Sequence, residues 1–444
     1  MRCNMEEMMK DSGCRWIGYI PQSWSTKRIK YIATLKGRIG WQGLTSDEYQ
    51  DDGAFLITGT DFIDGGINWD TCVHVPIKRW EEAKEIQIEE GDLLITKDGT
   101  VGKVAIASGL PGETSLNSGV LRIMPIEGYS RRFLFWVLQS DVFWNWFNYR
   151  NAGNSTILHL YQDDFAEFIY AFPDEKGQEA IAYYLDKQCD KIDDVISDLE
   201  KQIEKLKEYK YALIKKCVTK GLDDSVALKD SGIRWIGKIP EHWERKRIKH
   251  ITSYIGSGTT PLSGDASYYD GGAINWIQSG DLYSKSAVTD TEVKITPFAL
   301  KKYSALKVLD PPYIVIAMYG ASVGNIAISE ISACSNQACC SIKTDKDNDL
   351  LYLYYWMLFC KEDFLSKSVG GGQPNISQVI IKNEIFIQPP LVEQQDIGKF
   401  LNSKCSNVDS IIKEKENQIE VIKNYKKSLI YEYVTGKKRV KEVG

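Results

Sequence analysis

The sequence predicts an α+β chain with an internal pseudo-twofold duplication. Two globular domains of mixed α/β character are joined by two long helices that form an antiparallel coiled coil. Three observations predict this: a segment that is written twice, a heptad pattern that follows each copy, and strand-like runs in the interiors. We expect globular domains over residues 11–177 and 230–389, and helices over residues 178–220 and 390–436.

The duplication is the strongest signal. Residues 10–30 read KDSGCRWIGYIPQSWSTKRIK and residues 229–249 read KDSGIRWIGKIPEHWERKRIK, with 15 of 21 positions identical at an offset of 219. Residues 178–219 and 394–435 form a second matched pair, whereas the interiors barely align. Each half is therefore the same scaffold around a different middle.

The second matched segment has the four-three apolar spacing of a coiled-coil seam. Lys210 interrupts the first copy, and Lys415 and Lys426 interrupt the second, where Lys426 is the equivalent of Lys210. Either each helix packs on its own domain, or the two helices pair, which we favour. Domain termini usually lie close together, so the second helix should run back along the first. The predicted seam residues are Leu185, Ile192, Ile196, Leu199, Ile203, Leu206, Leu213, Leu401, Val408, Ile412, Ile419, Ile422 and Leu429.

Composition narrows the class of protein. The net charge of -5 argues mildly against a nucleic-acid partner, but the charge is uneven, with basic runs at residues 27–30 and 245–249. These runs either contact phosphate or cover an exposed helix face. The ten cysteines form no CxxC pair, so we expect no metal site, and free thiols suit a reducing cytoplasm. No apolar run is long enough to span a membrane, and no signal peptide is expected.

Each interior contains short strand-like runs bounded by Gly and Asp. Residues 54–57, 92–95 and 103–106 form this pattern in the first interior, and 273–277, 313–317 and 325–328 form it in the second. A glycine-bearing turn, KDGTVG in the first and YGASVG in the second, joins two strands in each. Both interiors are therefore expected to be small mixed domains.

The chain resembles a known family, the specificity (S) subunit of type I restriction-modification systems. The resemblance is carried by the WIGxIPxxW opening, by DLLITKDGTVGKVAI and IAMYGASVGNIAI, and by PPLVEQ before the second heptad helix, and it covers essentially the whole chain. The first copy departs from it with PDEKGQ over residues 173–178.

The resemblance implies a subunit without catalytic activity that works in the cytoplasm of a prokaryote, away from membranes. Each globular segment would be a target-recognition domain that reads one half of an asymmetric, bipartite site in double-stranded DNA. The paired helices would set the gap and hold two methyltransferase (M) subunits, and restriction/translocase (R) subunits would join. No cofactor is expected on this chain, because S-adenosylmethionine, ATP and Mg²⁺ would bind the partner subunits.

Reading bases requires amide, guanidinium and hydroxyl groups on loops that reach the major groove. Both interiors offer polar loops, at residues 37–42, 97–98 and 150–154 in the first and at residues 257–260 and 370–375 in the second. The residues predicted to contact DNA are Arg38, Gln42, Lys97, Asp98, Arg150, Asn151, Asn154, Ser257, Thr259, Thr260, Tyr319, Ser322, Gln373 and Asn375.

One motif offers an enzymatic alternative. Asp310-Pro311-Pro312-Tyr313 has the form of the catalytic motif of DNA amino-methyltransferases, in which the aromatic ring stacks on a flipped base. The first copy has no such motif at the equivalent place, and no cofactor-binding βαβ pattern follows the upstream glycines. A subunit without catalysis is therefore the favoured interpretation.

Overall fold

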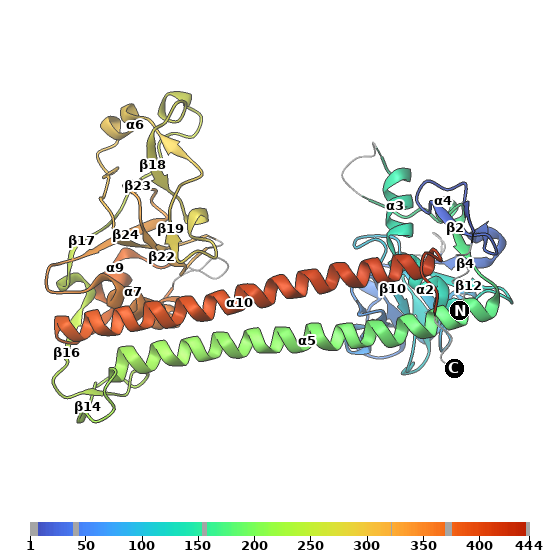
Figure 1. Cartoon of the computed structure of the whole chain (residues 1–444), viewed down its shortest axis with the longest axis horizontal. Coiled ribbons are helices and arrows are strands. Elements are labelled where there is room, and N and C mark those ends of the chain that lie inside the picture. The colour runs from blue at the N-terminus through green and yellow to red at the C-terminus, as the bar shows by residue number, and fades with distance from the viewer. Residues whose placement is uncertain (1–7, 39–43, 153–157, 321, 369–374, 441–444) are drawn as a thin grey trace, which may run out of the picture. The chain divides into compact units, whose positions relative to one another are not determined.

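The computed structural model of the chain describes residues 8–38, 44–152, 158–320, 322–368 and 375–440. The chain divides into two compact units, residues 1–199 with 417–444, and residues 200–416. Each unit contains one globular part and half of each long helix (Figure 1). We call the globular parts head one, residues 8–174, and head two, residues 221–390.

Head one is built on a four-stranded antiparallel sheet with the strand order β10-β9-β12-β4. A three-stranded sheet, β11-β5-β8, contains one parallel pair, and β3 pairs with β13 at the base. Two apolar helices, α2 and α3, contribute to the main core. The bounds are β1 Met9–Asp11, β2 Tyr19–Pro21, β3 Ser25–Arg28, β4 Ala33–Gly37, β5 Ala54–Ile57, β6 Phe62–Ile63, β7 Gly66–Ile67, β8 Val73–Val75, α1 Ile77–Glu81, β9 Leu93–Thr96, β10 Val104–Ile106, β11 Thr114–Leu116, β12 Val120–Pro125, α2 Arg131–Gln139, α3 Asp141–Arg150, α4 Gln162–Ala166 and β13 Ile169–Phe172.

Head two repeats this plan. Its main sheet has the order β17-β24-β21-β22-β19, the second sheet is β20-β18-β23, and β16 pairs with β25. The bounds are β14 Leu228–Asp230, β15 Lys238–Pro240, β16 Glu244–Arg247, β17 Thr252–Ser257, β18 Ile274–Ile277, β19 Ala287–Val288, β20 Lys294–Ile295, α6 Pro297–Lys302, β21 Tyr313–Ala317, β22 Ile326–Ser329, β23 Ala333–Ser335, β24 Cys339–Thr344, α7 Leu350–Phe359, α8 Lys361–Ser366, α9 Gln378–Asn383 and β25 Ile385–Gln388.

The two glycine-bearing turns join antiparallel strands, as predicted. Gly102 and Gly324 end these turns with φ of 83° and 75°, a backbone conformation that favours glycine. At Gly102 a Cβ atom would also lie 2.6 Å from the Trp144 ring. The turn therefore needs glycine for both its backbone and its packing.

The long helices are α5, Glu175–Lys220, and α10, Leu391–Val434. Helix α5 begins three residues before the predicted start at residue 178. The cause is the PDEKGQ segment, in which the Asp174 carboxylate accepts a hydrogen bond of 3.0 Å from the Gly177 backbone N–H and caps the helix. The segment that departs from the family pattern thus supplies its own helix start.

The two helices pair in each unit. In the first unit, the Tyr184 ring lies against the Tyr433 ring, and Lys426 bonds to Asp193. In the second, Lys415 bonds to Gln202 and Lys210 bonds to Asp409. Residue numbers rise along α5 while they fall along α10, so the pairing is antiparallel, and the prediction of a coiled coil is confirmed.

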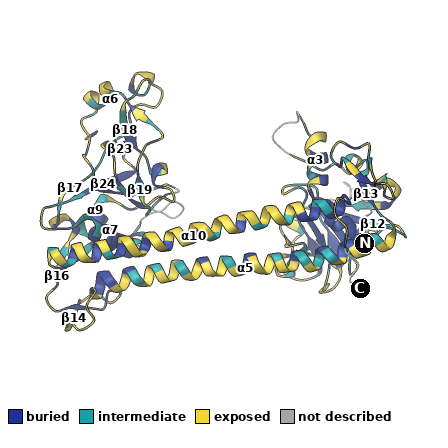
Figure 2. Ribbon diagram, in the orientation of Figure 1, coloured by how far each residue is buried: buried dark blue, intermediate teal, exposed yellow. Residues whose placement is uncertain are grey.

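The predicted seam is buried or half-buried along its length (Figure 2). The buried members are Leu185, Ile196, Ile203, Leu401, Val408, Ile412, Ile419 and Leu429. The half-buried members are Ile192, Leu199, Leu206, Leu213 and Ile422.

Candidate nucleic-acid interface

Each head brings several polar loops together at one end of its two sheets. We call these segments the reading loops. They are residues 58–60, 97–102, 117–119 and 158–162 in head one, and residues 257–260, 278–280, 319–324, 336–338 and 375–378 in head two, within the described ranges.

Backbone hydrogen bonds hold the reading loops of head one together. The Lys97 N–H donates to the Gly119 carbonyl at 2.8 Å, and the Asn117 N–H donates to the Ile57 carbonyl at 3.0 Å, just before residues 58–60. The Leu160 N–H donates to the Lys97 carbonyl at 2.9 Å, and the adjacent His159 side chain pairs with Asp98. Four segments distant in sequence are thus fixed beside one another.

Head two has the same bonds at the equivalent positions. Met318 donates to the Ala338 carbonyl at 2.7 Å, Asn336 donates to the Ile277 carbonyl at 2.9 Å, and Ile376 donates to the Met318 carbonyl at 2.7 Å. The side chains presented differ, because Thr260 bonds to Gln337 and Gln378 bonds to Ser257. A common backbone frame therefore displays two different sets of donors and acceptors.

A buried aspartate shapes the loop after the first strand of the smaller sheet. Asp61 is fully buried and accepts hydrogen bonds from the Thr58 backbone N–H at 2.7 Å and from the Thr71 hydroxyl at 2.9 Å. Asp281, its counterpart, accepts from the Gln278 N–H at 2.8 Å. Sequence reasoning missed these loops. The signal was an aspartate four residues after a predicted strand in both copies, in TGTD and QSGD.

The residues predicted to contact DNA fall into four groups, the last of which is Arg38 alone. Those on the reading loops or directly beside them are Lys97, Asp98, Ser257, Thr259, Thr260, Tyr319, Ser322 and Asn375, although the Ser322 side chain is buried. Arg150 and Asn151 lie at the end of α3, where Arg150 pairs with Asp164 and Asn151 donates to the Phe147 carbonyl. Gln42, Asn154 and Gln373 lie outside the described residues.

Arg38 is placed differently from the residues on the reading loops. Its guanidinium is buried and donates to the Leu116 carbonyl at 2.8 Å and to the Ser115 hydroxyl at 3.2 Å. Burial, with Arg79 nearby, lowers the pKa of Arg38 to about 10, which leaves it charged at neutral pH. Arg38 therefore connects the end of β4 to β11 and does not project from a loop.

The enzymatic alternative fails on its aromatic residue. Tyr313 is the first residue of the central strand β21, is fully buried, and donates from its hydroxyl to the Ala333 carbonyl at 3.2 Å. Burial raises the pKa of Tyr313 to about 12. A ring enclosed in the core cannot stack on a flipped base, and Asp310 accepts a hydrogen bond of 3.1 Å from the Ser332 hydroxyl beside it.

The comparison with known protein families agrees with this geometry. The model of the type I restriction modification DNA specificity domain matches the chain twice, over residues 21–205 and 240–421. The chain belongs to this family. It is a specificity subunit with two DNA specificity domains, a class without catalytic activity, so the methyltransferase alternative is wrong.

Specificity subunits are similar to this chain over nearly its whole length. The putative type I restriction enzyme MjaX specificity subunit of Methanocaldococcus jannaschii is 27% identical, covering 96% of both chains. The MjaIX specificity subunit of the same organism is 24% identical, again covering 96% of both.

Solved structures agree with the fold. One, described as the structural basis of complex assembly and conformational transition of the type I R-M system, has a TM-score of 0.71 at 15% identity, covering 94% of this chain and 99% of the other. The HsdS subunit from Thermoanaerobacter tengcongensis has a TM-score of 0.50 at 14% identity, covering 94% and 98%. Among the described helices of this specificity subunit, none is both long and apolar enough to cross a membrane.

Proposed function

We propose that each head reads one half of an asymmetric, bipartite site in double-stranded DNA, and that the paired helices set the gap between the halves. The observation that carries this proposal is the repeated backbone frame of the reading loops with different side chains on it. Identical frames would place both heads on DNA in the same way, and different side chains would select different bases.

The helices offer two equivalent sites for partner subunits. Val195 and Tyr209 lie two heptads apart on α5, and Ile411 and Tyr425 are their equivalents on α10. All four are exposed, with exposed fractions between 43% and 56%. Each unit has one apolar pair, Val195 with Tyr425 or Tyr209 with Ile411, which we call a docking pair.

The four residues of the docking pairs remain exposed although the heads contact the helices nearby. Contacts from head one reach Asp186, where Arg132 and Trp136 donate, and head two reaches the equivalent Asn402 through Tyr355. Duplicated apolar surface of this kind fits two copies of one partner, and we assign it to two methyltransferase subunits. Restriction/translocase subunits would join them in a prokaryotic cytoplasm, and S-adenosylmethionine, ATP and Mg²⁺ would bind these partners.

Mapping of methylated bases in cells that carry the complex tests the reading of DNA. We expect a two-part motif whose halves differ in sequence. Lys97→Ala should relax one half only, because Lys97 lies on head one, and Thr259→Ala should relax the other. A palindromic motif, or one substitution that alters both halves, would contradict the proposal.

Native mass measurement of the assembled complex tests the docking pairs. Tyr425→Ser should lower occupancy by one methyltransferase subunit at limiting concentration, Tyr209→Ser should do the same at the other site, and the double variant should lose both. Lys207→Ala with Lys423→Ala, an equivalent pair elsewhere on the two helices, is the matched control and should keep both subunits. Retention of both by the double tyrosine variant would exclude this surface.

A further inference from the structure

An equivalent pair of basic side chains has different hydrogen-bond and ion-pair partners in the two heads. In head one, Arg28 and Lys30 both form ion pairs with Glu167, with 3.0 Å between Arg28 Nη1 and Glu167 Oε2. In head two, the equivalent side chains are Arg247 and Lys249, and the residue in the place of Glu167 is Asn383. The Asn383 amide oxygen accepts from Lys249 at 3.0 Å and from Arg247 at 3.3 Å.

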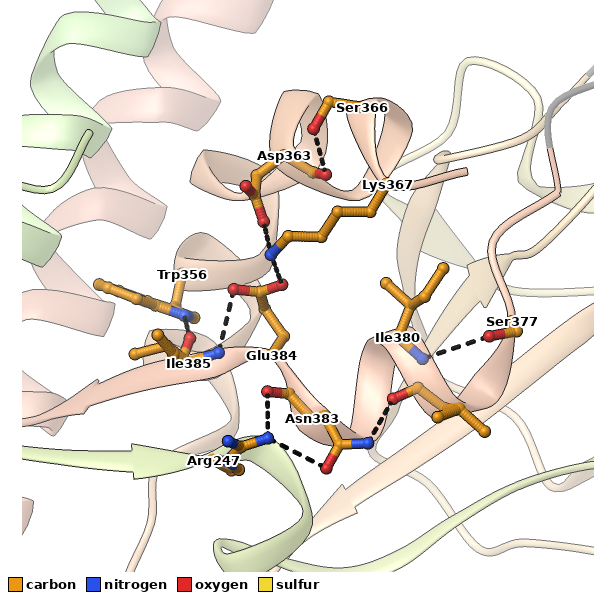
Figure 3. Close-up of polar contacts among 11 residues, drawn as sticks. Arg247, Trp356, Asp363, Ser366, Lys367, Ser377, Ile380, Asn383, Glu384 and Ile385 are labelled. Atoms are coloured by element: carbon orange, nitrogen blue, oxygen red, sulfur yellow. Dashed lines mark hydrogen bonds and ion pairs between the residues drawn. The ribbon is translucent and has the colours of Figure 1, made fainter. Parts of the chain in front are cut away.

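An amide holds the two cations in place without neutralising them. Arg247 and Lys249 are both exposed. The next carboxylate along the chain, Glu384, is buried and turned away from Arg247 toward Lys367, whose Nζ lies 2.7 Å from Glu384 Oε2 (Figure 3). Glu384 is therefore already paired, and the positive charge of Arg247 and Lys249 remains at the surface.

A short helix connects this basic pair to the reading loops of head two. Helix α9 begins at Gln378, whose amide donates to the Ser257 hydroxyl, and it ends at Asn383. Gln378 and Asn383 are five residue steps apart, so at about 1.5 Å per step the two contacts are separated by roughly 7.5 Å, or about two base-pair steps of DNA. Any DNA lying on the reading loops would thus have backbone phosphates within reach of Arg247 and Lys249.

Head one has the same connection with its charges paired. Helix α4 starts at Gln162, which donates to the Leu35 carbonyl of β4 at 3.4 Å, and Glu167 follows its end. Asp164 on the same helix pairs with Arg150, and the equivalent of Asp164 in head two is the apolar Ile380. Head one therefore neutralises cations at the place where head two leaves them available.

We propose that Arg247 and Lys249 bind backbone phosphates beside the half-site read by head two, and that Glu167 withholds the equivalent pair in head one. The electrostatic hold on DNA is then one-sided: head two supplies most of the sequence-independent affinity, and head one depends more on its base contacts. This inference rests on the proposed reading of DNA by the two heads. Salt dependence is the direct measure of phosphate contacts, because each contact contributes about 0.9 to the slope of log K against log salt.

The experiment uses the assembled complex and a duplex of random sequence, titrated with KCl. Arg247→Gln with Lys249→Gln should lower the slope by about 2. The matched variant of head one, Arg28→Gln with Lys30→Gln, should change it by much less. Asn383→Glu, which leaves both cations in place and adds the carboxylate of head one, should lower the slope by about 2, and Glu167→Asn, which frees two cations, should raise it by about 2.

Thermal unfolding of each variant checks that the heads remain folded. Because Arg247 and Lys249 are exposed, replacing them should not disturb folding, so this double variant gives the decisive measurement. An unchanged slope for that variant, or an equal loss from both heads, would overturn the one-sided hold while leaving DNA reading intact. A wild-type complex that binds no DNA at low salt would instead overturn the proposed function itself.

Discussion

Lys210 and Lys426 interrupt the heptad seam in sequence, and each forms an ion pair with an aspartate of the other helix. Lys210 Nζ lies 2.6 Å from both carboxylate oxygens of Asp409, and Lys426 Nζ lies 2.6 Å from both oxygens of Asp193. A shifted register would separate both lysines from these aspartates and so break both ion pairs at once. These residues therefore specify direction and register more than they add stability.

A charge-reversal cycle tests this role. Lys210→Asp should lower the free energy of unfolding, because it places two carboxylates together, and Asp409→Lys in the same chain should restore most of it. Since both side chains are partly exposed, we expect a coupling energy of about 0.5–1 kcal/mol. Urea unfolding of the two single variants and the double variant measures it, and additive effects would mean that the pair does not couple the helices.

Asp310 is the residue on which the enzymatic alternative depended. Its carboxylate bonds only to Ser332 among the contacts described, beside a buried Tyr313. Asp310→Ala should cost about 1 kcal/mol of stability or less and leave methylation by the assembled complex unchanged. Methylation that disappears while DNA binding and assembly persist would require the catalytic interpretation to be revived.

At the scale of the elements, α5 and α10 are one continuous helix each, and both contribute to both units. If they set the gap, a matched insertion should widen it. Seven residues placed within Leu199–Leu206 and within Lys415–Ile422 preserve the heptad and add about 10 Å. We expect the unread gap to grow by roughly one to three base pairs at about 3.4 Å each, with both half-sites unchanged.

Methylome sequencing of cells with the lengthened subunit reads this out. The control is an insertion of seven residues in α5 alone, which moves Lys210 out of register with Asp409 and should destabilise the helix pair. An unchanged gap in the matched variant would show that the helices do not determine spacing.

At the scale of the whole molecule, the two halves share the backbone frame of their reading loops and also the backbone hydrogen bond at the base of each head. The Ile29 N–H donates to the Phe168 carbonyl at 2.9 Å, and the Ile248 N–H donates to the Glu384 carbonyl at 3.0 Å, closing the base of each head in the same way. Replacing residues 252–384 with residues 33–168 should therefore join compatible strands. Two copies of head one related by the pseudo-twofold duplication should recognise a palindromic site.

Mapping of methylated bases checks that chimera. The expected motif has the half-site of head one at both ends, inverted, with the natural gap. A folded chimera that still methylates the parental asymmetric motif would show that residues outside the heads contribute to selection.

The scaffold was predictable from sequence because duplication and heptad spacing are local patterns that survive without knowledge of partners. The seam lysines were visible as interruptions, but their aspartates lie 199 and 233 residues away. The burial of Arg38 was not predicted because it depends on β11, a tertiary contact that no spacing reveals. The assignment of particular reading-loop side chains to base contacts stays a prediction. The backbone frame fixes where the loops lie, whereas the choice of side chain depends on the base sequence of the bound DNA.

The antiparallel seam also has a consequence for synthesis. Helix α5 is complete at residue 220, yet its partner surface on α10 lies roughly 200 residues later in the chain. At translation rates of about 5–20 residues per second, the apolar stripe of α5 stays uncovered for roughly 10–40 s. During that interval each nascent α5 already carries both Asp193 and Lys210, the complementary charges of the finished seam. Nascent chains on neighbouring ribosomes of one message therefore expose complementary surfaces. Pairing of α5 with α10 of the same chain competes with pairing of two α5 helices from different nascent chains.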